Sequence, residues 1–232
     1  MTEDALDIPG LLARATLADR GLAALSPAAC VQALGLDSLT LCLLDHSGLE
    51  LIWYDPDHHA GISFDLQFTL GQGPTPDAAR TGEPVLVPDL HTVPEDRWPA
   101  FLQATHHHHP RAVFALPLTL GAIRLGTLTG HRSTPGALTR SQIQALFALA
   151  EGAVAILTTP QGIHDMRADQ PISLHRAVIH QATGALTVRL NISIDQALIR
   201  LRAYAFTHNR SLHDVANVVV EHRSNLDKPP TC

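Results

Sequence analysis

The chain has 232 residues, is 45% hydrophobic and carries a formal net charge of −6 at pH 7. This length and apolar content allow one or two domains with a sizeable core, and the negative charge argues against indiscriminate nucleic-acid binding. Three cysteines, Cys30, Cys42 and Cys232, show no metal-type spacing, so a disulfide framework is not expected. The first residues lack a signal-peptide pattern, and Arg124 and Glu151 interrupt the longest apolar runs. We therefore expect a cytoplasmic protein that does not enter a membrane.

The first quarter of the chain predicts helices followed by a hairpin. An amphipathic segment at 8–25 precedes Ser26-Pro27, an N-cap and N1 pair that begins a short helix. Two strand-like runs, 38–44 and 49–54, flank the turn sequence Asp45-His46-Ser47-Gly48.

The next hundred residues, roughly, add strands and a long helix. Residues 84–88 predict a short strand, and 113–120 with 123–129 predict a second hairpin that turns at Gly121. Apolar residues at helical spacing then predict a helix over 141–157. The pattern indicates an α+β domain, with an antiparallel sheet and helices at both of its sequence ends.

Short motifs along this part carry a family resemblance. They are LGQGPT at 70–75, Asp77-Ala78, TGEPV at 81–85, Asp89-Leu90, Trp98-Pro99, ALPL at 115–118 and LGTL at 125–128. Together they resemble the GAF sensor domain of bacterial regulators over about residues 22–158. Relatives commonly show G-E-G-P-C at the first motif, so Gln72 and Thr75 are departures, and no role that depends on that acid or thiol carries over.

The resemblance implies a sheet-based pocket, because GAF domains in different relatives bind cyclic nucleotides, haem, bilins or other small ligands, or serve only for dimerisation. Which cofactor or ligand this chain would take stays unassigned. Alternating strand positions would supply an apolar floor, and a plain hydrophobic core needs the same residue types. The expected floor residues are Thr40, Cys42, Trp53, Phe64, Phe114 and Leu116.

The C-terminal part predicts three short helices with clear punctuation. The first carries an apolar stripe and stops at Asn191, a residue that tolerates the left-handed conformation. The second opens with a capping box from Ser193 to Gln196 and ends at Asn209. The third begins at Ser211. Each helix has one apolar stripe, so the three must pack together or onto a partner.

Charge is unevenly distributed along the chain. Residues 1–160 contain 8 Arg against 16 Asp plus Glu, whereas residues 172–223 contain 6 Arg against 3 acidic residues. The C-terminal helices are therefore the basic part, which favours a polyanionic partner there over a merely solvated helix face.

The string QATGALTVRLNISIDQALIRLRAYAFTHNRSLHDVA at 181–216 resembles the ANTAR domain, a three-helix RNA-binding module of bacterial antiterminators. Thr183 and Thr187 depart from the Lys and Met usual there. The resemblance implies a dimer that binds two small RNA stem-loops in a nascent leader transcript and prevents the terminator hairpin. The residues expected to contact RNA are Arg189, Arg202 and Arg210 for phosphates, Gln181, Thr183 and Asn209 for base edges, and Gly184 for close approach of the backbone to RNA or to a neighbouring helix.

These observations predict a two-domain, non-enzymatic transcriptional regulator. The expected limits are 1–160 for the GAF-like domain, 161–171 for a junction, 172–223 for the ANTAR domain and 224–232 for a tail. Amphipathic segments at 8–25 and 141–157 predict a homodimer.

Other chemistry is less well supported by the sequence. A regulator whose ANTAR part binds a protein instead of RNA stays open, favoured by Thr183 and the modest positive charge. A GAF-type sulfoxide reductase would need cysteines spaced as a redox pair, which the three present do not show. Residues 106–109, four consecutive histidines, are interpreted as a polar surface loop and not as a metal site, because consecutive residues cannot easily direct four rings at one ion. Asp55-Pro56-Asp57-His58-His59 is interpreted as a solvated turn, because it falls between strands and no second cluster of carboxylates follows it.

Overall fold

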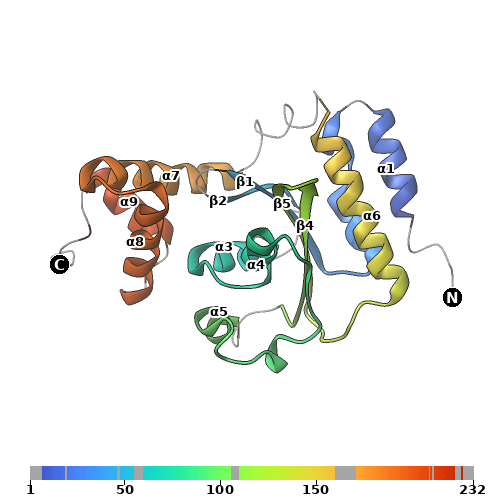
Figure 1. Ribbon diagram of the computed structural model, residues 1–232, viewed down its shortest axis with the longest axis horizontal. Coiled ribbons are helices and arrows are strands. Elements are labelled where there is room, and N and C mark those ends of the chain that lie inside the picture. The colour runs from blue at the N-terminus through green and yellow to red at the C-terminus, as the bar shows by residue number, and fades with distance from the viewer. Residues whose placement is uncertain are drawn as a thin grey trace. The chain divides into compact units, whose positions relative to one another are not determined.

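The computed structural model describes residues 7–18, 20–45, 48–54, 60–105, 110–159, 171–208, 210, 212–222 and 226 (Figure 1). Two compact units divide the chain, one within residues 1–169 and one centred on residues 170–232. The predicted loops at 55–59 and 106–109, most of the predicted junction and Asn209 lie outside the described residues.

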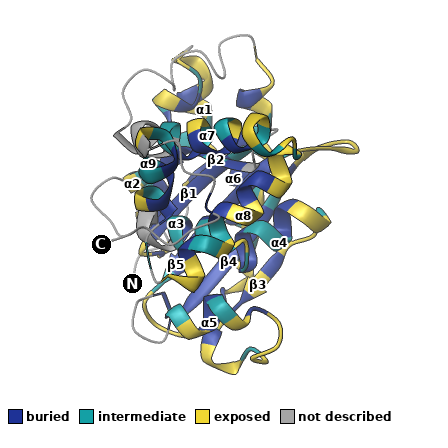
Figure 2. Ribbon diagram, turned by 90° about the vertical axis from the view of Figure 1, so that its left-hand side faces the viewer, coloured by how far each residue is buried: buried dark blue, intermediate teal, exposed yellow. Residues whose placement is uncertain are grey.

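The first unit contains an antiparallel sheet. Its described strands are β1 (Ser38–Asp45), β2 (Gly48–Tyr54), β3 (Val85–Val87), β4 (Ala112–Leu120) and β5 (Ile123–Arg132), in the order β2-β1-β5-β4-β3. Both predicted hairpins and the predicted short strand are confirmed. The central parts of β1, β4 and β5 are buried, as the dark blue ribbon in Figure 2 shows, whereas the end of β4 and the start of β5 are exposed.

One face of this sheet packs against the helices at the two sequence ends of the unit: α1 (Ile8–Leu17), η2 (Gly21–Ala24), α2 (Pro27–Leu34) and α6 (Arg140–Leu157). Local chemistry sets their ends. Ser26 caps α2 by accepting a hydrogen bond from the Ala29 amide at 3.3 Å, as predicted. Thr139 and Gln142 form a capping box at the start of α6. The amphipathic segment at 8–25 is a helix followed by a short 3-10 turn that begins at Gly21, whose φ is +55°.

Short helices also lie between the strands, in addition to the helices expected at the two sequence ends. They are α3 (Ala60–Leu70), α4 (Pro74–Thr81), η3 (Leu90–Thr92) and α5 (Pro99–Thr105). The LGQGPT motif leads directly into α4, which begins at Pro74. Proline fits the first helical position because its missing N–H has no partner there in any case. The sequence does not predict α3, because AGISFDLQFTL has no stripe of polar residues at helical spacing.

The second unit consists of α7 (Pro171–Leu190), α8 (Ile194–Thr207) and α9 (Leu212–His222). Asn191 adopts φ +52° directly after α7, and Ser193 and Gln196 form the predicted capping box on α8. The apolar stripes meet in one core, since its members are at most 6% exposed: Ile179, Ala182, Leu186, Ala197, Leu198, Leu201, Ala205, Leu212, Val215, Ala216 and Val219. The predicted fold class, an α+β sheet domain followed by three helices, is confirmed.

Candidate functional site

Small and polar side chains from β1 and β5 gather on the sheet face opposite the end helices. The ladder pairs Ser38 with His131, Thr40 with Thr129 and Cys42 with Thr127, and paired residues point to the same face. All six are at most 5% exposed. We call them the polar row.

Helices α3 and α4 provide the polar partners of this row. The Thr75 and Thr129 hydroxyl oxygens are 3.1 Å apart, and Gln67 Oε1 accepts a hydrogen bond from the Thr75 amide at 2.8 Å. In the polar row and on α3, three buried atoms have no hydrogen-bond partner among the described residues: Gln67 Nε2, Thr127 Oγ1 and His131 Nε2. Buried polar groups normally find partners, from protein, water or ligand. The face can therefore offer hydrogen bonds to a small uncharged molecule or to ordered water.

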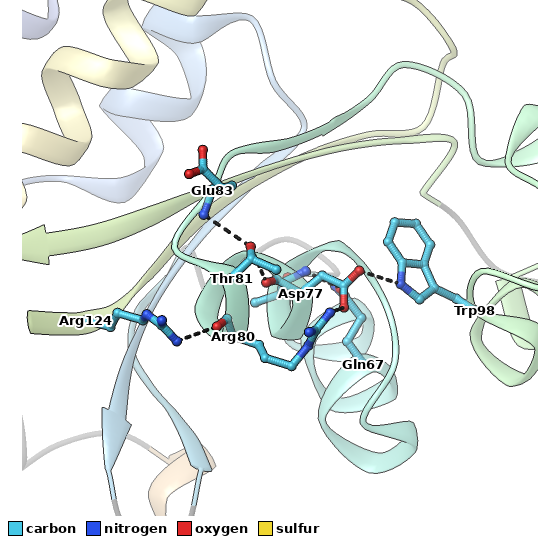
Figure 3. Close-up of polar contacts among 8 residues, drawn as sticks. Gln67, Asp77, Arg80, Thr81, Glu83, Trp98 and Arg124 are labelled. Atoms are coloured by element: carbon cyan, nitrogen blue, oxygen red, sulfur yellow. Dashed lines mark hydrogen bonds and ion pairs between the residues drawn. The ribbon is translucent and has the colours of Figure 1, made fainter. Parts of the chain in front are cut away.

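Helix α4 is fixed by polar contacts at several points (Figure 3). Asp77 accepts hydrogen bonds from the Trp98 indole and from the Arg80 guanidinium, both at 3.1 Å. Arg124 of β5 donates to the Arg80 carbonyl, and the Thr81 hydroxyl donates to the Asp77 carbonyl at 2.9 Å. Of these contacts, the one from Arg124 joins α4, which carries Thr75, to β5, the strand that carries Thr129.

The expected pocket floor does not form one surface. Phe114 and Leu116 pack in the hydrophobic cluster beneath the end helices, as does Trp53, whose indole donates to the Leu25 carbonyl at 2.8 Å. Phe114 pairs with Gly130 whereas Thr40 pairs with Thr129, so consecutive β5 positions carry them to opposite faces.

The expectation that Phe64 lies on a strand also needs correction, because this residue belongs to α3. Its ring is stacked on the ring of Phe68, with 6.1 Å between the two centroids. Of the expected floor residues on strands, Thr40 and Cys42 are the pair that belongs to the polar row.

On α7 the structure separates the predicted RNA-contacting residues. Gln181 and Gly184 are exposed on one side of the helix. Thr183 is 3% exposed and its hydroxyl donates to the Ile179 carbonyl at 2.7 Å. The expectation that Thr183 offers a polar group at the surface therefore needs correction, because it lies on the buried stripe with Ile179 and Ala182.

Arg189 has a contact within the unit that the sequence did not indicate. Its guanidinium donates to the Val219 carbonyl at 3.0 Å. Val219 lies in the last turn of α9, where carbonyls lack helical partners and a cation is favourable. The side chain therefore helps to join α7 to α9.

The remaining predicted contacts lie on or just after α8. Arg202 and Arg210 are half-buried. Burial lowers the pKa of Arg202 to about 10, which leaves the guanidinium charged at neutral pH. Gly184 has open space around it, because a Cβ built there meets nothing within 4 Å. Packing against the described helices therefore does not require a glycine at this position.

Comparison with protein families assigns both units. A GAF domain model matches residues 20–157, which is more than half of the chain. The chain belongs to the GAF domain family. An ANTAR domain model matches residues 174–220, the three-helix unit. The GAF and ANTAR resemblances drawn from the sequence are thereby confirmed.

Solved structures are similar to part of this chain. The GAF domain of a phosphoenolpyruvate-protein phosphotransferase from Coxiella burnetii is 16% identical, with 67% of this chain and 95% of that chain covered and a TM-score of 0.48. A free methionine-R-sulfoxide reductase from Neisseria meningitidis, solved with its substrate, is 17% identical, with 70% and 89% covered and a TM-score of 0.48. The comparison with curated proteins gave no match.

Two positions at which this GAF domain departs from its relatives have visible structural partners. Gln72 Oε1 accepts hydrogen bonds from the Ala100 and Phe101 amides at 3.0 and 3.4 Å, so it caps the start of α5. Thr75 takes part in the contact with Thr129 described above.

Among the described helices, none has the length and apolarity needed to cross a bilayer.

The polar row has a signal in the sequence of β5. Thr127, Thr129 and His131 alternate with Leu128 and Gly130 along β5, a period of two that places the polar residues on one face. Gln67 and Thr75 had no such signal, because their helices were not predicted.

His131 should make the stability of the GAF unit depend on pH. Burial lowers its pKa from 6.5 to about 4, with Asp37 opposing the shift. Because the folded-state pKa is the lower one, the stabilisation is fully present above the unfolded pKa and is lost as pH falls through the folded pKa. We expect up to about 3 kcal/mol of unfolding free energy to be lost between pH 7 and 4.

Urea unfolding across this pH range, compared between the wild type and His131→Gln, measures the effect, because the difference between the two proteins isolates what the histidine contributes. An equal pH dependence in the two would show that His131 does not contribute.

Proposed function

We propose that this protein is a cytoplasmic transcriptional regulator that binds stem-loops in nascent RNA through its ANTAR domain and acts as an antiterminator. The observation that carries the proposal is the ANTAR match over the three-helix unit, which is also the basic part of the chain. Stabilising a leader stem-loop would prevent formation of a competing terminator hairpin. RNA loops are recognised by basic contacts to phosphates and by contacts to splayed bases, which are the groups this unit can serve.

The proposed RNA-contacting residues follow from what each side chain can reach. Gln181 and Gly184 are exposed three residues apart on α7, so they lie on one side of it. Arg202 and Arg210 provide charge for phosphates, and Asn209 stays a proposal from the sequence. Arg189 is exposed and is already bonded to Val219, so it would combine a structural contact with its charge. Thr183 would act indirectly, through the packing of α7.

Gly184→Ala is expected to separate stability from RNA binding. Alanine is favoured over glycine inside a helix by about 1 kcal/mol, and the new methyl group meets open space. The unit should therefore become more stable by about 1 kcal/mol, whereas RNA whose backbone approaches Gly184 closely would bind about tenfold more weakly. Thermal unfolding and filter binding measure the two effects. Higher thermal stability with unchanged RNA affinity would show that Gly184 does not lie at the RNA interface.

Crosslinking in cells, followed by sequencing of the bound RNA, tests the function itself. Recovery of leader transcripts that share a paired stem-loop motif supports antitermination. Recovery of protein adducts without enriched RNA would favour the alternative, in which the ANTAR unit binds a protein partner.

For the GAF domain we propose sensing of a small uncharged ligand at the polar row, or a dimerisation role alone. The three buried atoms without partners support sensing, and the absence of charged side chains in the row disfavours a charged ligand. We also propose that the protein is not an enzyme. Burial raises the pKa of Cys30 to about 12, so this thiol does not supply the thiolate that sulfoxide reduction requires.

We further propose a homodimer with the domain limits given by the sequence, 1–160 and 172–223 joined by 161–171. Leu17 of α1 is 86% exposed and Phe147 of α6 is 38% exposed, which leaves apolar surface for a symmetry mate to cover. Sedimentation velocity of the full chain at micromolar concentration tests this state.

A further inference from the structure

Helix α8 carries large apolar side chains on the side that faces away from its own core. Ile199 and Phe206 are 62% and 61% exposed, with the exposed Ala203 between them. The spacing i, i+4, i+7 places the three on one face, opposite the buried Leu201 and Ala205. We call Ile199, Ala203 and Phe206 the α8 stripe.

Cations lie along this stripe. Arg200 is exposed on the same helix, Arg202 lies next to Ala203, and Arg210 follows the C-terminal end of the helix. Asp195, in the first turn, is the acidic residue of the α8 sequence. The surface thus combines an exposed aromatic ring and aliphatic carbon with an excess of positive charge.

We propose that the α8 stripe is a stacking platform for an unpaired RNA base, with Phe206 against the base and Arg200 and Arg210 at the adjoining phosphates. The proposal rests on the proposed RNA-binding function. Loop bases splay out of a stem and stack on aromatic side chains, because the flat face of every base is apolar. Long cationic side chains can reach the phosphates on either side of such a base. A purely apolar docking surface would not need these cations.

A second copy of the chain fits this surface less well. A two-fold contact of α8 with itself, centred on Ala203, would bring Arg202 close to Arg202 of the second copy. Like charges placed together across an interface are destabilising, whereas one RNA strand satisfies arginines along the whole stripe. Charge therefore favours the polyanion.

Binding measurements on the full chain test the platform. The probes are RNA hairpins with one common stem and a randomised loop, selected on the wild-type protein, and the same stem as a duplex without a loop. Phe206→Ala should weaken binding of a selected hairpin by about tenfold to a hundredfold and leave the salt dependence unchanged. Phe206→Trp should retain the affinity. Arg200→Ala should weaken binding and reduce the salt slope by about one.

The matched control is Val188→Ala, which removes an 82% exposed apolar side chain from α7 and should bind as the wild type does. A selected hairpin that binds Phe206→Ala with wild-type affinity overturns the platform and leaves RNA binding in place. If the wild-type protein retains no hairpin over the duplex, the proposed function fails and the platform with it. If Phe206→Ala converts a dimer to a monomer at unchanged hairpin affinity per protomer, the stripe is an interface between two copies.

Discussion

Gly126→Ala is expected to unfold the sheet of the GAF domain. Gly126 lies on β5 opposite Leu43 of β1, and a Cβ there would overlap the Cys42 carbonyl oxygen and lie 2.8 Å from the Cys42 carbonyl carbon. Both atoms belong to the backbone of the neighbouring strand, so no side-chain rotation can relieve the overlap. We expect a loss of several kcal/mol, against a total stability of about 5–15 kcal/mol for a typical domain.

The measurement is urea unfolding followed by tryptophan fluorescence, because Trp53 and Trp98 are the two tryptophans of the chain and both belong to the GAF domain. Gly121→Ala is the matched control on the same hairpin, since a Cβ at Gly121 meets nothing within 4 Å. It should cost only about 1–2 kcal/mol, from the left-handed conformation at φ +60°. Similar midpoints for the two variants would contradict the strand contact.

Leu201→Ala is expected to remove the ANTAR domain's fold and its RNA binding together. Leu201 is fully buried among the three helices. Replacing a buried leucine by alanine costs about 2–5 kcal/mol, and a unit of this size has little stability in reserve. We therefore expect a loss of helical circular dichroism and of hairpin binding, with the tryptophan-detected unfolding of the GAF domain largely retained.

Val188→Ala serves again as the control, because it shortens an exposed side chain by a similar amount and should change stability by less than about 0.5 kcal/mol. Full hairpin binding by Leu201→Ala would show that the three-helix core is not needed for recognition.

Local sequence chemistry determined much of this protein. Ser26-Pro27, Asn191 and the Ser193 to Gln196 capping box fixed helix ends where predicted, because a cap satisfies backbone groups only a few residues away. Hairpins were equally predictable, since strand alternation and turn residues are local. Two family patterns then identified both domains.

The tertiary structure decided which side chains share a surface. Alternation along a strand shows which of its residues share a face of the sheet with Thr40 or with Phe114. Only the register of β1, β5 and β4 shows that Thr40 and Phe114 lie on opposite faces. Helix α3 lacks an amphipathic stripe, so its position over the sheet depends on contacts such as that between Gln67 and Thr75. Likewise, Arg189 bonds to a residue thirty positions away. Contacts of this kind join segments distant along the chain, and no pattern within either segment encodes the partner.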